Sequence, residues 1–286
     1  MRPANIVTSV ADVIAGICIS GFLAEKHSSA FFLVPVLLLC ISTIGLYGGG
    51  VVFNDVFDAA LDRVERPERP IPSGVISIKE ATLLGGLLLS AGIIAAFLCN
   101  GVSGFIACMI AAAALVYNKW GKHHSIAGPL NMGLCRGLNL LLGISILPWA
   151  LQNWWALALV PIMYIASITM ISRGEVHGGK KATLYAASML YFLVISFILY
   201  FSHTQGKLVY AVIFIVPFAW MIFRPLLQAI RQPVGKNIGM AVKAGVLALI
   251  LMDAAWAAAF GSLLAAMAIL VLLPVSIRLG KAFAVT

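Results

Sequence analysis

A series of apolar runs recurs along the whole length of this chain, and no other feature constrains its fold as strongly. Each run is close to the roughly 20 residues that an α-helix needs to cross the hydrocarbon core of a bilayer. Helices span membranes because they pair all their backbone groups within one segment. The runs predict an all-α, polytopic integral membrane bundle of ten helices, at about residues 6–24, 31–53, 81–98, 103–117, 129–147, 155–171, 183–201, 208–223, 239–258 and 261–277.

Composition agrees with a membrane protein. Of the 286 residues, 62% are hydrophobic and only 10% are charged, which excludes an ordinary soluble globule. No polar stretch is long enough for a separate soluble domain, so residues 1–286 are expected to form a single transmembrane domain. The run at 6–24 lacks a small-residue cleavage site and is expected to be a retained span, not a signal peptide.

The basic residues are distributed unevenly between the two sides of the predicted bundle. If the N-terminus is cytoplasmic, 15 of the 19 lysines and arginines fall in cytoplasmic segments and two fall outside. This asymmetry follows the positive-inside rule, so the net charge of +9 indicates orientation, and no nucleic-acid partner is expected. Three cytoplasmic loops, 54–80, 118–128 and 172–182, hold most of the residues capable of chemistry.

An acidic motif follows the second predicted span. Asp55, Asp58 and Asp62 are spaced at i, i+3 and i+7, so on a continuing helix they share one face. Carboxylates placed this way repel one another, and a divalent cation relieves the repulsion. Mg²⁺ prefers oxygen ligands and is typically held by one or two carboxylates together with substrate phosphates. Arg66 and Arg69 follow, and guanidinium groups suit phosphate oxygens.

The alternative is a solvated loop in which these acids and arginines pair only with one another. Such surface pairs are common and contribute little to stability. The regular spacing, and the presence of six of the chain's ten acidic residues between positions 55 and 80, favour a metal–diphosphate site.

The segment NDVFDAALDRVERPERPIPSG, residues 54–74, resembles the first aspartate motif of the UbiA-type intramembrane prenyltransferases. The order of elements is also similar: a Tyr-x-Lys loop follows the fourth span and a second acidic motif follows the sixth. The resemblance implies nine or ten helices around a central cavity. It also implies Mg²⁺ as cofactor, a polyprenyl diphosphate donor bound through that metal, and transfer of the prenyl group to a small acceptor with release of diphosphate.

The same resemblance assigns roles to individual residues. Asp55, Asp58 and Asp62 would hold Mg²⁺ and act in catalysis. Diphosphate would be contacted by residues of the first two loops: Asn54, Arg66, Arg69, Tyr117, Lys119 and Lys122.

The second acidic motif departs from the family pattern, as in a branch in which this motif is degenerate. Of its usual aspartates, Glu175 is the one carboxylate left; Ser172 and Gly179 replace the others. Glu175 is expected to complete the metal shell through water as a further catalytic and metal-binding residue. Either the metal site is reduced, or Arg173 and His177 take over part of the anion binding.

Arg136 and Asn139 share one face of the fifth predicted span. A charge at this depth is expected to face the bundle interior. One interpretation is a helix–helix contact, with Asp12 or Asp253 as partner; the other is that Arg136 and Asn139 line the substrate pocket.

The function predicted from the sequence is Mg²⁺-dependent transfer of a prenyl group to a small aromatic or polar cyclic acceptor. The alternative is a non-catalytic lipid- or isoprenoid-binding protein, or a transporter, with the same fold. Besides donor and acceptor, membrane lipids are the expected partners. The expected location is a bacterial inner (plasma) membrane with the site loops in the cytoplasm.

Overall fold

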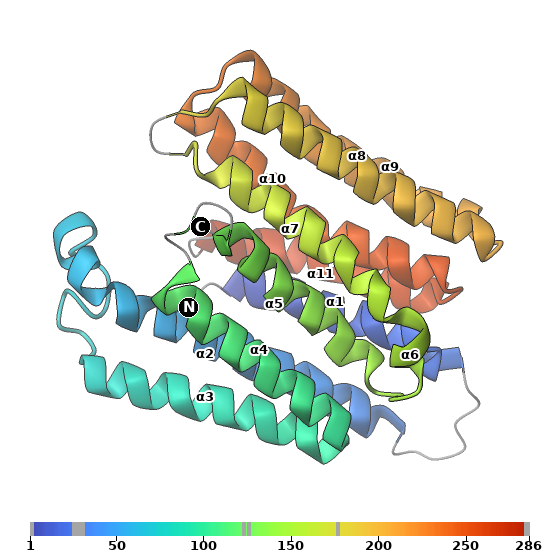
Figure 1. The fold of residues 1–286 in the computed structure, drawn as a ribbon, viewed down its shortest axis with the longest axis horizontal. Helices are drawn as coiled ribbons and strands as arrows, with labels where there is room; N and C mark the ends of the chain where they lie inside the picture. The colour runs from blue at the N-terminus through green and yellow to red at the C-terminus, as the bar shows by residue number, and fades with distance from the viewer. Residues whose placement is uncertain (1–2, 25–31, 122–123, 125–126, 176–177, 283–286) are drawn as a thin grey trace.

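The computed structural model describes residues 3–24, 32–121, 124, 127–175 and 178–282. Within these ranges the chain is helical without strands, so the predicted all-α bundle is confirmed (Figure 1). Its helices are α1 (Pro3–Ser20), α2 (Leu33–Glu65), α3 (Ile78–Cys99), α4 (Gly101–Lys119), α5 (Ala127–Ile144), α6 (Ala150–Trp154), α7 (Leu159–Ser172), α8 (Lys181–Thr204), α9 (Leu208–Arg231), α10 (Gly235–Ala259) and α11 (Leu263–Ala282).

The prediction of ten spans matches ten long helices among the described residues, with the short α6 leading into α7. In the part of the chain that the structure describes, nine segments are long and apolar enough to cross a membrane by themselves, α6 and α7 counting as one. The long helix outside this group is α5, whose polar residues lower its hydropathy. A membrane helix with such residues must turn them toward the bundle interior.

α1 lies at the centre of the bundle and contacts α2, α5, α10 and α11 (Figure 1). Its crossing with α5 is made possible by two glycines. A Cβ atom built on Gly16 would lie 2.9 Å from the Cα atom of Gly143, and a Cβ on Gly143 would overlap the Val13 carbonyl. Small residues let membrane helices approach this closely. The crossing places the polar residues of α1 against those of α5.

Aromatic side chains fill the interior between α7, α8, α9 and α10. The ring of Tyr164 lies 5.1 Å from that of Tyr191 and 5.5 Å from that of Phe218. Near the C-terminal ends of α8 and α10, Trp256 packs against Phe201 with ring centroids 5.6 Å apart. These contacts hold the far side of the bundle together and leave the polar residues between α1, α2, α4, α5, α7 and α10.

Candidate active site

The acidic motif lies on the last turns of α2, which continues as predicted beyond Asn54 to Glu65. Asp55 and Asp62 share a face, because one Arg69 Nη1 atom lies 3.5 Å from Asp55 Oδ1 and donates to Asp62 Oδ2 at 2.7 Å. Asp62 is buried and Asp55 is partly exposed. Asp58, one turn after Asp55, is also partly exposed.

The two arginines after α2 have different surroundings. Arg69 folds back over α2 to the carboxylates, which is the ion pairing considered as the alternative for this motif. Arg66 ends α2, donating its backbone N–H to the Asp62 carbonyl at 2.9 Å, and its side chain is exposed. Arg66 is therefore open to an anion from solvent, whereas Arg69 already has carboxylate partners.

The last turn of α4 contributes Tyr117, which lines the central cavity described below. Lys119 is exposed, with its Nζ atom 4.4 Å from the centre of the Trp120 ring. Lys122 lies outside the described residues. Between Tyr117 and Lys119, the buried Asn118 donates from Nδ2 to the Gly50 carbonyl at 2.8 Å and joins α4 to α2.

The loop after α7 meets the other two loops. Ser172 and Glu175 line the cavity, and Arg173 donates from Nη2 to the His124 carbonyl at 3.0 Å. Arg173 is otherwise exposed, and His177 lies outside the described residues. The structure therefore brings loops 54–80, 118–128 and 172–182 to one end of the bundle.

A central cavity of about 380 Å³ runs inward from these loops. Its polar lining comes from α1, α2, α4, α5, α7 and the loop after α7, and consists of Asn5, Thr8, Ser9, Thr43, Tyr47, Asn54, Tyr117, Asn118, Arg136, Asn139, Thr169, Ser172 and Glu175. The remaining lining is mainly aliphatic, with Val242, Val246 and Leu249 contributed by α10. A concave site with polar groups on apolar walls is typical of a small-molecule pocket.

The inner wall of the cavity is a buried hydrogen-bonded network. Arg136 Nε lies 2.7 Å from Asp12 Oδ2, and Arg136 Nη2 donates to Thr8 Oγ1 at 2.6 Å. Asn139 Nδ2 donates to the same Asp12 oxygen at 3.0 Å, and Asn139 Oδ1 accepts from Thr43 Oγ1 at 2.7 Å. The predicted helix–helix contact with Asp12 is therefore present, and both residues also line the cavity; that this cavity binds substrate stays a prediction.

The sequence interpretation missed the polar face of α1. Asn5, Thr8, Ser9 and Asp12 are spaced at i, i+3, i+4 and i+7, the period of one helix face. This spacing could have indicated from the sequence that α1 has a polar face. Ser9 accepts from Asn139 Nδ2 through its carbonyl at 2.8 Å. Arg136 and Asn139 are therefore held by residues of α1 that lie 127 to 130 positions earlier in the chain.

The donor set of the first motif fits Mg²⁺. Asp55 and Asp62 bring hard oxygen atoms within reach of a single cationic nitrogen, so one small cation can be shared between them. Among the described residues, no group of three or more His, Cys, Asp and Glu side chains forms a complete metal cluster. The arrangement suits a metal that takes its remaining ligands from phosphates and water.

Fold and site together define a class: a helical membrane protein with an internal polar cavity that is lined by Asn54, the residue at which the acidic motif begins. The chain belongs to the UbiA prenyltransferase family, whose sequence model matches residues 13–238. The suspected resemblance is confirmed.

Several digeranylgeranylglyceryl phosphate synthases are among the curated relatives. The protein of Methanosarcina mazei is 34% identical over 144 residues, which cover 50% of each chain. The protein of Methanothrix thermoacetophila is 29% identical over 205 residues, covering 70% of this chain and 74% of the relative. The chain spans about half the length of the first of these relatives.

Solved structures share the fold. A UbiA homologue from Aeropyrum pernix superposes with a TM-score of 0.73 at 18% identity, covering 89% of this chain and 98% of the homologue. A homologue from Archaeoglobus fulgidus, solved with DMAPP and Mg²⁺, gives a TM-score of 0.59 at 14% identity and covers 87% and 99% of the two chains.

Proposed function

We propose that this protein is an integral membrane prenyltransferase that transfers a prenyl group from a polyprenyl diphosphate to a small acceptor and releases diphosphate. One observation carries the proposal. Asn54 of the acidic motif and Glu175 of the second motif line the same cavity, whose inner wall is the polar Arg136 network. The cavity therefore connects a site suited to a metal and diphosphate with groups able to bind a second, polar molecule.

Two comparisons support this proposal. The relatives are named for a product that carries geranylgeranyl groups on a glyceryl phosphate, which implies prenyl attachment to a non-aromatic molecule. The Archaeoglobus fulgidus homologue was solved with DMAPP, a prenyl diphosphate, and with Mg²⁺.

In the proposed reaction, Asp55, Asp58 and Asp62 would hold Mg²⁺ and through it the donor's diphosphate, and Glu175, which lines the same cavity as Asn54, would be a further ligand through water. Mg²⁺ supplies the positive charge that stabilises the departing diphosphate. Asn54 donates to a diphosphate oxygen from the last turns of α2.

The exposed Arg66, Lys119 and Arg173, with Tyr117 and Lys122, complete the anion-binding end of the site. Preorganised cations of this kind stabilise the charge that develops on a leaving group. The C–O bond to the diphosphate breaks with its electron pair on oxygen. A hydroxyl oxygen of the acceptor bonds to the prenyl carbon, and its proton passes to the released diphosphate.

Arg69 has a second role in this proposal. Its guanidinium bridges Asp55 and Asp62, so it keeps the two carboxylates close before a cation arrives. A cation held by Asp55 and Asp62 would compete with Arg69 for these carboxylates. The Arg69 guanidinium, whose planar donors suit phosphate oxygens, would then be available to the diphosphate.

The inner wall favours a polar, hydroxylated acceptor over an aromatic one. The Arg136 charge is balanced by Asp12, with Asp253 close by, so this end offers hydrogen bonds without an excess positive charge. Thr8, Ser9 and Asn139 can exchange hydrogen bonds with hydroxyl groups. A polyhydroxylated cyclic acceptor fits this lining.

We also propose that the site loops face the cytoplasm, because the basic residues concentrate on their side of the bundle. The location that follows is the plasma membrane of the cell. A bacterial origin gains no support from the relatives, which are mostly archaeal.

A second function, binding or transport of an isoprenoid lipid without turnover, is favoured by one observation. Glu175 is the one carboxylate that the second motif retains. A protein that binds diphosphate through the first motif alone would keep the fold and the donor site but lose catalysis.

The experiment that separates these functions uses purified protein, Mg²⁺, a labelled polyprenyl diphosphate and a lipid-free cell extract as the source of acceptors. The proposal predicts diphosphate release and a labelled, prenylated product, both abolished in Asp55→Ala and Asp58→Ala. The matched control is Glu65→Gln, which changes an exposed carboxylate at the end of the same helix. Tight donor binding without product across many acceptors would establish the binding function instead.

A further inference from the structure

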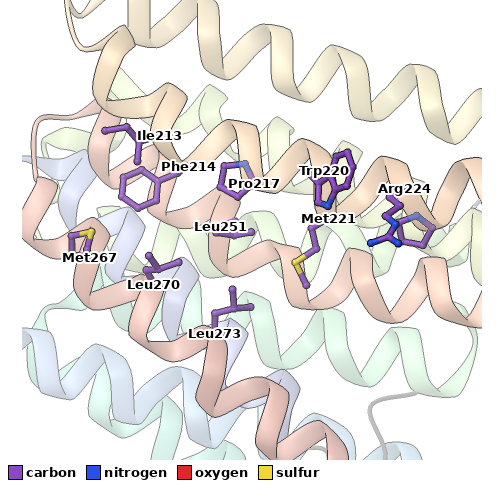
Figure 2. A pocket seen from close by; sticks show the side chains of 11 residues that line it. Ile213, Phe214, Pro217, Trp220, Met221, Arg224, Leu251, Met267, Leu270 and Leu273 are labelled. Atoms are coloured by element: carbon purple, nitrogen blue, oxygen red, sulfur yellow. The ribbon is translucent and has the colours of Figure 1, made fainter.

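A second cavity, independent of the proposed active site, lies on the outer surface between α9 and α11 (Figure 2). It is an open groove of about 700 Å³. The helices α9 and α11 both pack on α10, and Leu251 of α10 forms the buried floor of the groove. Side chains of α9 and α11 form the two walls, among them Trp220 and Met267, which are 68% and 50% exposed.

The groove is apolar along its length and carries one cation at its end. Figure 2 shows the apolar side chains running from Ile213 and Met267 toward Arg224. Arg224 lies on the side of the bundle that carries the acidic motif, because α9 ends beside the loop after α7, where the Gly179 N–H donates to the Pro233 carbonyl at 3.1 Å. The charged end of the groove therefore belongs to the same membrane face as the site loops.

Arg224 has no carboxylate partner among the described residues. Its guanidinium carbon lies 5.8 Å from the centre of the Trp220 ring, and its side chain is exposed. From Leu208 to the C-terminus the sequence contains one acid, Asp253, which is 1% exposed. Asp253 follows Leu251 by two residues and so projects from the opposite side of α10. An exposed guanidinium beside an apolar groove lacks its counter-charge.

The length of the groove matches one leaflet. Ile213 and Arg224 are eleven residues apart on one helix, which at about 1.5 Å per residue is about 16 Å. Half of a hydrocarbon core of about 30 Å is about 15 Å. A single acyl chain that starts at the membrane boundary covers this distance, whereas a transmembrane helix of a partner would need about twice as much.

We propose that this groove is a binding site for an anionic phospholipid of the leaflet on the side of the site loops. Its phosphate group pairs with Arg224, and one acyl chain lies between α9 and α11 over Leu251. Guanidinium groups bind phosphate oxygens through two parallel hydrogen bonds. A second copy of this chain fits less well. Asp12 and Asp253, the acids within spans, are both buried and cannot reach Arg224 of a neighbour.

The test is native mass spectrometry of delipidated protein titrated with phosphatidylglycerol or with phosphatidylcholine. We expect wild type to retain one phosphatidylglycerol in preference to phosphatidylcholine. Arg224→Gln should weaken phosphatidylglycerol binding about fivefold, the effect of one basic side chain near an anionic head group. Arg224→Lys should keep most of the preference. Arg231→Gln, which removes a charge from α9 outside the groove, should match wild type.

A filling variant tests the apolar part of the site. Leu270→Trp puts a large ring into the groove and should reduce retention of both lipids. The proposal is overturned if Arg224→Gln binds phosphatidylglycerol as wild type does, or if wild type binds the two lipids equally. It is also overturned if the protein is a dimer that Leu270→Trp dissociates, because the groove would then be an interface between copies.

Discussion

The buried pair of Arg136 and Asp12 should be among the most sensitive points of the structure. Arg136 Nε lies 2.7 Å from Asp12 Oδ2, and the two side chains are 8% and 1% exposed. Asp12→Asn keeps a hydrogen-bond acceptor of the same shape but leaves the Arg136 charge without its closest partner. Removing one member of a buried ion pair costs about 3–5 kcal/mol. Asp253, a second buried carboxyl that interacts electrostatically with Arg136, remains in this variant, so we expect about 3 kcal/mol.

Removing both charges should cost much less than removing one. In Asp12→Leu/Arg136→Met no charge is left unpaired, and such apolar replacements are often close to neutral. We expect a loss of about 1 kcal/mol or less for the double variant, far below the sum of the two single losses. The control Thr43→Val removes one hydrogen bond to Asn139 and should cost about 0.6 kcal/mol, the average for such bonds within membranes.

The assay is the free energy of unfolding in mixed detergent micelles, measured as the mole fraction of denaturing detergent is raised. The reasoning is refuted if Asp12→Asn and Arg136→Met each cost less than 1 kcal/mol. An additive double variant would refute it too, because additivity means that the two groups do not interact.

Three further results are expected. Gly143→Val should destabilise the bundle by more than about 2 kcal/mol in the same unfolding assay, because its side chain would overlap the Val13 carbonyl of α1; wild-type stability would contradict the close crossing. Ser77→Ala should cost about 1 kcal/mol, because Ser77 Oγ accepts from the Glu80 N–H at 3.2 Å in a capping box that begins α3; an unchanged unfolding midpoint would show that α3 does not depend on this cap. Chelation of divalent cations should abolish diphosphate release and added Mg²⁺ should restore it; release that persists in excess chelator would exclude the proposed metal.

Periodicity alone predicted much of the acidic motif. The spacing of Asp55 and Asp62 put them on one helix face, and α2 does carry both carboxylates there. Pairing between the acids and the arginines was the alternative prediction, but the sequence did not indicate that Arg69 would be the partner, because its return to this face depends on the turns around Pro67. These include the bond from the Arg69 N–H to the Arg66 carbonyl at 3.1 Å.

For the inner wall of the cavity, the sequence indicated which residues face inward but not which of them pair. The polar row from Asn5 to Asp12 is readable as one helix face, and Arg136 was expected to face inward. Their pairing depends on which helices cross, and that is decided by backbone contact at Gly16 and Gly143. Neither Gly16 nor Gly143 indicates in the sequence that the other glycine is its partner, so the crossing could not be predicted.

The sequence also did not distinguish structural residues from solvent-exposed residues at adjacent positions. At the end of α4, Asn118 is buried and bonds to α2, whereas Lys119 is exposed. Successive helical residues point about 100° apart, so a shift of one residue exchanges a structural role for a solvent-facing one.

The most direct measurement for the proposed function is the rate of diphosphate release from a labelled polyprenyl diphosphate with saturating Mg²⁺ and extract-derived acceptor. Wild type and Glu65→Gln should release diphosphate at the same rate, and Asp58→Asn should be slower by a factor of about 10² or more, as expected when transition-state charge loses its stabilisation. Equal rates for Asp58→Asn and wild type would contradict the assignment of the acidic motif as the diphosphate site.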